Sequence, residues 1–342
     1  MKYLKTFKEL INYNEYLESD DFITPNVSYI NDDNIVKYNP LPYFIMCTYS
    51  YHYAMGQSID LYNNGDNFLY MIVDGIKKPL SKSYTFNGSG NHNVMFALKD
   101  DSIIEDNTFQ GIYDLVNVII PLSVQTIGKN AFNSCNSLES INIPDSVTTI
   151  GDVAFIGCEV LDNIILPNSL TIINRQVFQA CDNLKNIIIP NSVTTIEGSA
   201  FLDCTSLESI NIPNSVTTIG KSAFENCTSL VNINLSNGVE RIGYQSFCGC
   251  SSLESINLPL SIRSIDDLAF ENCIKLKEII CNSLSDALST PTIGSYKPFL
   301  NVCSNGVLKV PAGSDYTLIY NEGYNGPEED SLAAQGWTVE FI

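Results

Sequence analysis

The chain has 342 residues and carries 18 Lys and Arg against 38 Asp and Glu, for a net charge of −20. A polyanion of this kind repels nucleic-acid phosphates and anionic membrane surfaces, so we expect no nucleic-acid partner. No stretch approaches 18 consecutive apolar residues, and the start lacks the apolar segment of a secretory signal, so we expect neither membrane insertion nor export by that route.

Residues 1–42 are predicted to form a helix and an extended attachment segment. Thr6 and Glu9 fit a capping box, and the apolar stripe that follows predicts a helix ending near Ser19. That stripe consists of Phe7, Leu10, Ile11, Tyr13 and Leu17. Prolines break the segment after the helix. A piece of this length has little core of its own, so we expect it to dock onto another protein.

Residues 43–99 predict a small β-rich module resembling a sandwich. Turn residues separate the alternating runs 43–53, 58–62, 68–73, 83–86 and 93–98. Two hairpins are expected, one at Asp74-Gly75 and one at the turn Asn87 to Gly90. We expect this module to cover the N-terminal end of the array that follows.

Residues 100–281 repeat one phrase with a constant 23-residue period, and such a period predicts a solenoid. The proline positions are Pro121, Pro144, Pro167, Pro190, Pro213 and Pro259. The phenylalanine positions are Phe132, Phe155, Phe178, Phe201, Phe224, Phe247 and Phe270. The cysteine positions are Cys135, Cys158, Cys181, Cys204, Cys227, Cys250 and Cys273. No single unit has enough apolar area to fold alone, so the coils must stack.

Each coil predicts a short helical turn followed by two extended pieces. Spacings of three around Phe201 and Cys204 favour a helical or 3₁₀ turn, whereas Ile210 and Ile212 alternate as in a strand. Pro213 ends that strand, and a second extended piece follows. The fold class expected is therefore an α/β solenoid.

Residues 282–342 are predicted to form a divergent last coil and a C-terminal cap. The register breaks after Ile280, because the interval from Phe270 to Phe299 is longer than the 23-residue period. The tail through Trp337 and Phe341 is expected to cover the apolar end of the array.

The repeated phrases "AFENCTSLVNI" and "IPNSVTTIG" resemble the BspA-like class of leucine-rich repeats over about residues 100–311. The closing "VPAGSDYTLIY" is similar to the terminal segment of such arrays. The resemblance implies a curved, right-handed solenoid, found on bacterial surfaces, in protists and in viral genomes, and associated with adhesion or host interaction. It implies no catalytic residues.

The opening "FKELINYNEYLESDDFITPNVSYINDDNIVKYNP" resembles N-terminal segments of gut Bacteroidales phage and prophage proteins. This resemblance implies that residues 1–42 bind virion proteins while the solenoid faces the host, which places the protein in the phage particle.

The sequence indicates no enzyme, cofactor or metal site. We expect the ladder cysteines to be buried and reduced, because parallel side chains one coil apart do not suit a disulfide. Cys248 is off the ladder and is expected to be exposed. The histidines, His52 and His92, lie in no recognised catalytic motif, and we interpret them as surface or partly buried imidazoles.

The outward side chains of the first strand in each coil are the predicted partner-binding residues. These are Asn142, Ile165, Ile188, Asn211, Asn234 and Asn257. The asparagines either bond to one another as a structural ladder or bind a sugar or protein. The isoleucines Ile165 and Ile188 favour a contact, because contiguous exposed apolar area marks an interaction site.

Three functions remain open. The first is a non-enzymatic module that binds a protein or glycan on a host cell, carried by a phage particle. The second is a secreted or cell-surface adhesin of a bacterium or protist. The third is a structural scaffold component of a larger assembly.

Overall fold

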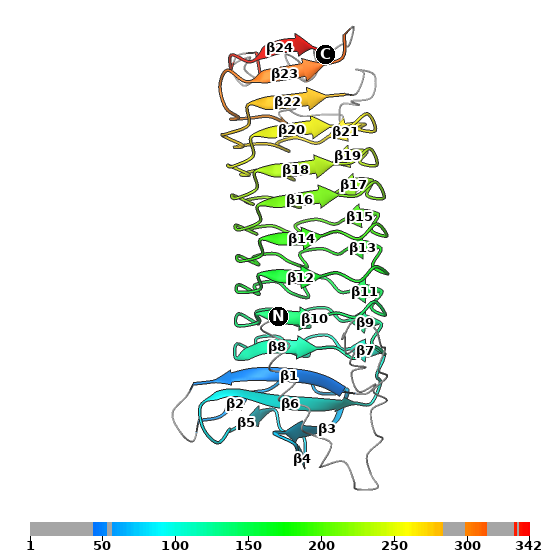
Figure 1. Cartoon of the computed structure of the whole chain (residues 1–342), viewed down its shortest axis with the longest axis vertical. Coiled ribbons are helices and arrows are strands. Elements are labelled where there is room, and N and C mark those ends of the chain that lie inside the picture. The colour runs from blue at the N-terminus through cyan, green and yellow to red at the C-terminus, as the bar shows by residue number, and fades with distance from the viewer. Residues whose placement is uncertain (1–43, 53–56, 283–297, 313–331, 334) are drawn as a thin grey trace, which may run out of the picture.

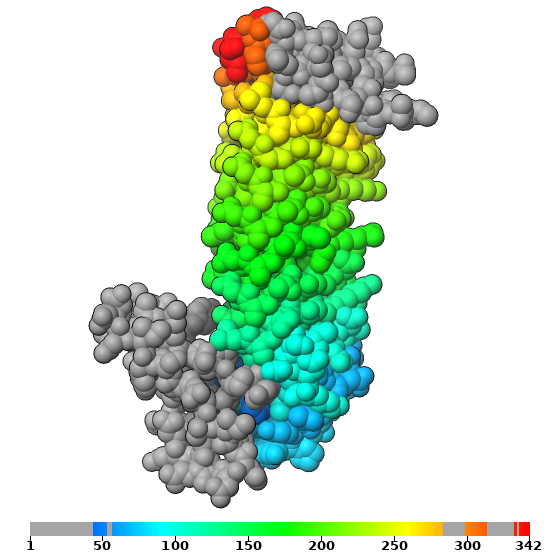
Figure 2. All heavy atoms as spheres, turned by 90° about the vertical axis from the view of Figure 1, so that its right-hand side faces the viewer, coloured from blue at the N-terminus to red at the C-terminus, as the bar shows by residue number. Residues whose placement is uncertain are grey.

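The computed structural model describes residues 44–52, 57–282, 298–312, 332–333 and 335–342. The predicted attachment segment at 1–42 and part of the predicted cap lie outside these residues. The described residues stack into one column, from an N-terminal sheet to β24 (Thr338–Phe341) at the other end (Figure 1). Seen from the side, the coils follow one another without a hollow between them (Figure 2).

The N-terminal strands extend the sheet of the solenoid. They are β1 (Phe44–Tyr51), β3 (Phe68–Val73), β4 (Ile76–Lys78) and β6 (Gly90–Leu98). The sheet order is β10-β8-β1-β6-β3-β4, and β1 pairs antiparallel with β8 of the first coil. The strands of the predicted β-rich module are therefore continuous with the first sheet of the solenoid, and the sandwich-like arrangement stays a prediction. Alternate residues of β1, such as Cys47 and Tyr49, are buried and cover the end of the core.

One of the two predicted hairpins is present. Strands β3 and β4 pair across Asp74 (φ 45°) and Gly75 (φ 83°), both in the left-handed region that a tight hairpin turn requires. The second prediction is wrong. Strand β5 (Ser83–Tyr84) pairs with β2 (Ile59–Asp60), while β6 pairs with β1 and β3.

The first strand of each coil lies in a parallel stack whose register follows the 23-residue period, as in the pairing of Ile164 with Ile187. These strands are β8 (Leu115–Ile119), β10 (Ser140–Asn142), β12 (Asn163–Ile165), β14 (Asn186–Ile188), β16 (Ser209–Ile212), β18 (Asn232–Leu235), β20 (Ser255–Leu258) and β22 (Glu278–Cys281). Their alternation of buried and exposed residues leaves every second side chain on the outer face.

The second strand of each coil forms a parallel ladder on another side of the column (Figure 1). Its members are β7 (Ile103–Ile104), β9 (Thr126–Ile127), β11 (Thr149–Ile150), β13 (Ile172–Ile173), β15 (Thr195–Ile196), β17 (Thr218–Ile219), β19 (Arg241–Ile242) and β21 (Ser264–Ile265). The last residue of each strand is a buried isoleucine, so both strands of a coil contribute to one core.

The expected helical turns are absent among the described residues, so the α/β class is wrong and the solenoid is built from strands and turns. The N–H of Cys204 donates to the oxygen of Phe201 (3.2 Å), which closes a single turn. Ser199 (φ 57°) and Asp203 (φ 61°) are left-handed, and this conformation ends a helix. The N–H of Phe201 instead donates to Ala223 of the next coil (2.8 Å).

Phenylalanines and cysteines fill the core in two parallel rows. The phenylalanine rings stack from Phe109 to Phe299, as between Phe132 and Phe155, whose centroids are 5.2 Å apart with planes 2° from parallel. The ladder cysteines are buried and free, as predicted. Each thiol donates to a phenylalanine oxygen of the preceding coil, as Cys204 Sγ does to Phe178 (3.1 Å). Burial raises the pKa of the Cys204 thiol well above its ordinary value.

The sheet continues past the break in the repeat. Strand β22 pairs in parallel with β23 (Val307–Val310), and β23 pairs with β24. Although the interval from Phe270 to Phe299 exceeds the repeat period, their rings stay stacked at 5.1 Å. Trp337 is buried at this end, and its indole N–H donates to the oxygen of Cys303 (2.7 Å). The stacking of the core therefore continues across the break in the repeat.

Candidate binding face

The outer side chains of β10, β12, β14, β16, β18 and β20 form one continuous surface, which we call the amide face. It consists of Ser140, Asn142, Asn163, Ile165, Asn186, Ile188, Ser209, Asn211, Asn232, Asn234, Ser255 and Asn257. The strands lie one above another in the view of Figure 1. All six predicted partner-binding residues are exposed on this face.

The amide face carries no charged side chain, although the chain has a net charge of −20. Its flank, in the turn just before each strand, carries charges such as Asp162, Lys185 and Glu208. Its C-terminal boundary is ionic, because Lys309 of β23 pairs with Glu278 of β22 and lies 4.0 Å from Glu340 of β24. A neutral strip across six coils is therefore bordered by charge.

Two isoleucines form the apolar part of this face. Ile165 and Ile188 are partners in the register of β12 and β14, and their exposed fractions are 75% and 83%. Other coils place either asparagine at the same position, as at Asn142 and Asn211, or isoleucine, as at Ile280. Nothing in the repeat itself therefore requires isoleucine here, which favours an external contact.

The asparagines divide into bonded and unbonded groups. Asn234 Nδ2 donates to its register partner Asn211 Oδ1 (2.7 Å), as a structural ladder requires. Asn257 Oδ1 accepts from Asn282 Nδ2 (2.5 Å), which lies outside the face, because the register partner of Asn257 is Ile280. In the described part of the chain, Asn142, Asn163, Asn186 and Asn232 have no side-chain hydrogen bond. Three members of the unbonded group, Asn142, Asn163 and Asn186, lie on β10, β12 and β14 around the two isoleucines, whereas Asn232 lies on β18. Polar and apolar groups are therefore available together at those three strands.

Sequence reasoning did not identify the ionic boundary of the face. Lys309 pairs in register with Ile280, and the interval between the two is longer than the repeat period, so Lys309 does not follow from the periodic pattern. The late position of Phe299 in the sequence could have revealed it, because the same insertion shifts Phe299 and Lys309 relative to the repeat.

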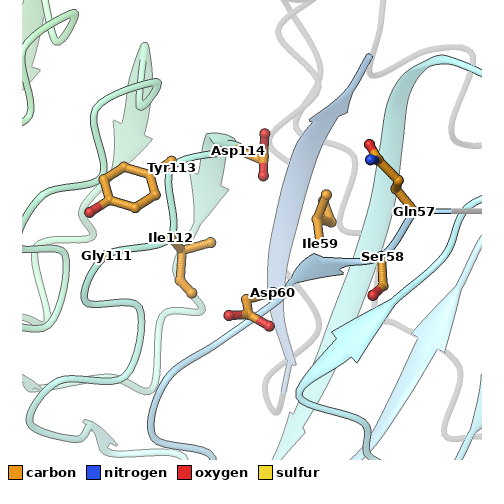
Figure 3. A pocket seen from close by; sticks show the side chains of 8 residues that line it. All are labelled: Gln57, Ser58, Ile59, Asp60, Gly111, Ile112, Tyr113 and Asp114. Atoms are coloured by element: carbon orange, nitrogen blue, oxygen red, sulfur yellow. The ribbon is translucent and has the colours of Figure 1, made fainter. Parts of the chain in front are cut away.

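A pocket of about 580 Å³ lies where the N-terminal sheet meets the first coil. It is lined by residues 57–60 and 111–114, with Asp60, Tyr113 and Asp114 around it (Figure 3). Neither histidine lines it. His52 is exposed, and His92 Nδ1 lies 3.3 Å from Asp74 Oδ2. No histidine base therefore faces the pocket's hydroxyl groups.

The described residues hold no cluster of three or more His, Cys, Asp or Glu placed to bind a metal ion. Cys248, expected to be exposed, is buried, and its Sγ lies 3.6 Å from Glu271. Burial and the carboxylates of Glu271 and Glu225 raise the pKa of this thiol to about 12. It is therefore protonated at neutral pH and a poor metal ligand.

Within the described ranges, no helix has the length and apolar character needed to cross a bilayer.

The family model for the "BspA type Leucine rich repeat region (6 copies)" matches residues 102–231 and 171–296, which together span more than half of the chain. Among curated proteins, none matches this chain.

Three solved structures are similar to the chain. A leucine-rich repeat protein from Bacteroides ovatus is 24% identical, with a TM-score of 0.46, over 66% of this chain and 69% of that one. A leucine-rich repeat protein from T. pallidum is 28% identical, with a TM-score of 0.44, over 56% and 90%. A leucine-rich cell surface protein from Faecalibacterium prausnitzii is 23% identical, with a TM-score of 0.27, over 67% and 86%. With TM-scores this low, no functional conclusion follows from these three structures.

Proposed function

The chain belongs to the BspA-type leucine-rich repeat family, and we propose that it is a non-enzymatic binding protein that recognises a cell-surface partner through its amide face. Solenoids of stacked repeats present long, regular surfaces of the kind used for binding. The family assignment supports a binding or adhesion role without naming a ligand.

The observation that carries the proposal is the exposed pair Ile165 and Ile188 within an uncharged face. Removing each isoleucine from water contributes about 1.5–3 kcal/mol. The neighbouring unbonded amides of Asn163 and Asn186 supply donors and acceptors that orient a partner. An apolar centre with polar surroundings is the usual anatomy of a binding surface.

The direct test measures binding of the fluorescently labelled full chain to a panel of gut bacterial cells. We expect the double variant Ile165→Asp and Ile188→Asp to lose at least ten-fold in affinity, because it places charge at the centre of a neutral contact. The matched control is Ile274→Asp, which changes an isoleucine 59% exposed outside the amide face. Equal binding by the double variant and wild type across the panel would contradict the proposal.

Where the protein resides is a separate part of the proposal. The resemblance of residues 1–42 to phage segments supports attachment to a virion, whereas the repeat family also supports a cell surface. Immunogold labelling of purified phage particles tests the first location, and labelling of intact cells of the producing strain tests the second. The same labelling also tests a scaffold role. If the face variants abolish cell binding but the protein is still labelled on intact particles or cells, the solenoid has a scaffold role in addition.

A further inference from the structure

We propose that the partner of the amide face is a linear, uncharged glycan that lies along the solenoid axis and presents about one sugar unit to each coil. This inference rests on the proposed binding function and specifies its ligand class.

The charge of the face selects an uncharged polymer. In a chain of net charge −20, all outward side chains of the six strands that form the amide face are neutral. An anionic glycan approaching this chain is repelled by the carboxylates that surround the face. A cationic partner has no carboxylate on the face itself to pair with. A neutral partner avoids both costs.

The residue types favour a glycan over a protein. Protein interfaces concentrate their binding energy in tryptophan, tyrosine and arginine, commonly in pockets. The amide face contains none of these residue types. Its asparagines each offer two donors and an acceptor, which suits sugar hydroxyls that both donate and accept. Ile165 and Ile188 add an apolar surface for the C–H groups of a sugar ring.

The unbonded amides locate the centre of the contact. Asn163 and Asn186 are register partners beside the isoleucine pair and make no side-chain hydrogen bond within the described residues. Asn211 and Asn234, farther along the face, bond to each other. A ligand therefore gains most at β12 and β14, where no internal hydrogen bond must be broken.

The spacing of the coils fits a polymer of identical units. Hydrogen-bonded strands lie about 4.8 Å apart, so the six strands of the face span about 24 Å. A pyranose unit in an extended chain advances by a distance close to one coil spacing. Successive units then meet successive coils in the same way, and affinity rises with chain length.

The experiment uses bacterial cells that bind the full chain, treated separately with periodate, which oxidises vicinal diols of sugars, and with protease. Neutral and acidic polysaccharide fractions from the same cells, separated by anion exchange, serve as competitors. We expect periodate and the neutral fraction to reduce binding at least ten-fold, and protease and the acidic fraction to leave it within two-fold.

A double variant and a matched control test whether the glycan binds at this face. The double variant Asn163→Ser and Asn186→Ser carries the residue that other coils have at this position, as at Ser140 and Ser209. It should weaken binding of the neutral fraction at least five-fold. The control Asn183→Ser changes an exposed asparagine outside the amide face, where other coils also have serine, and should leave binding unchanged.

Loss of binding after protease treatment but not after periodate treatment contradicts a glycan partner. The proposed binding function then still holds, with a protein as the partner. Competition by the acidic fraction alone also overturns the inference. Equal binding by wild type and by the Ile165→Asp and Ile188→Asp double variant contradicts both the inference and the proposed function.

Discussion

The rings of Phe201 and Phe224 lie 5.1 Å apart, with planes 5° from parallel, although the residues belong to successive coils. Each ring is fully buried and stacks on the ring before and the ring after it. The stacked rings therefore help to fix the position of each coil relative to the next. A change in one ring disturbs the packing at two interfaces between coils.

Phe201→Ala should lower the free energy of unfolding by about 3–5 kcal/mol, because it leaves a cavity in the close-packed row. Since stability in such arrays is approximately a sum over coils and their interfaces, we expect a second transition as the array divides at this coil. Urea denaturation followed by circular dichroism measures both effects. Phe201→Leu is the control and should cost less. Equal, small losses for both variants would show that the row is not close-packed.

Ser246→Ala should raise the free energy of unfolding by about 1 kcal/mol, because Ser246 Oγ is buried and has no hydrogen-bond partner among the described residues. The same position holds Ala223 and Ala269 in the neighbouring coils. The reverse change, Ala223→Ser, should lower stability by a similar amount. A loss of stability in Ser246→Ala would indicate that the hydroxyl is satisfied in solution.

Val153→Asn should raise the melting temperature. Val153 has φ 55°, a left-handed conformation that strains a β-branched residue and that asparagine tolerates. The two preceding coils place Asn107 and Asn130 here, with Asn130 Nδ2 donating to Asn107 Oδ1 (3.1 Å). We expect a gain of about 1 kcal/mol, measured by thermal unfolding. Val153→Thr, which keeps the β-branch, should bring no comparable gain.

Stability should fall above pH 9. Burial raises the pKa of the ladder thiols, such as Cys204, well above their ordinary value of 9.0. The thiols in the unfolded chain ionise near that value, so above it the unfolded state binds fewer protons than the folded state. The stabilising contribution is thus complete below pH 9 and declines as the pH rises, by about 1.4 kcal/mol per pH unit for each buried thiol.

Urea titrations at pH 8, 9 and 10 measure this slope. Removing one thiol, in Cys204→Ala, should reduce the slope by the contribution of one group. An unchanged slope in this variant would show that the buried thiols do not set the alkaline limit.

The periodic residues made the column predictable. Phenylalanine, cysteine and proline at one constant period are compatible with one arrangement of the coils, in which like side chains stack. Phe201 and Cys204 are buried in the core as this arrangement requires. The turns were mispredicted because Phe201, Cys204 and Leu207 have helical spacing. Residues with positive φ, such as Asp203, prevent a helix at these positions, and the periodicity of a sequence does not reveal whether φ is positive or negative.

Contacts between distant segments could not be predicted from period alone. The pairing of β1 with β8 joins residues far apart in the chain, such as Met46 and Ile119, with no shared repeat. On the amide face, the period placed Ile165 and Ile188 together, but the choice between bonded and unbonded asparagines depends on side-chain rotamers that sequence does not determine.

The central claim is that the amide face, and no other side of the column, binds the partner. The most direct measurement is a scan of single aspartate substitutions at Asn142, Ile165, Ile188, Asn211, Asn234 and Asn257, against a matched scan at Thr149, Thr195 and Thr218 of the second strand ladder. We predict that cell binding falls across the first set, most at Ile165 and Ile188, and stays within two-fold of wild type in the second. Loss of binding in the second set with an intact first set would contradict the account.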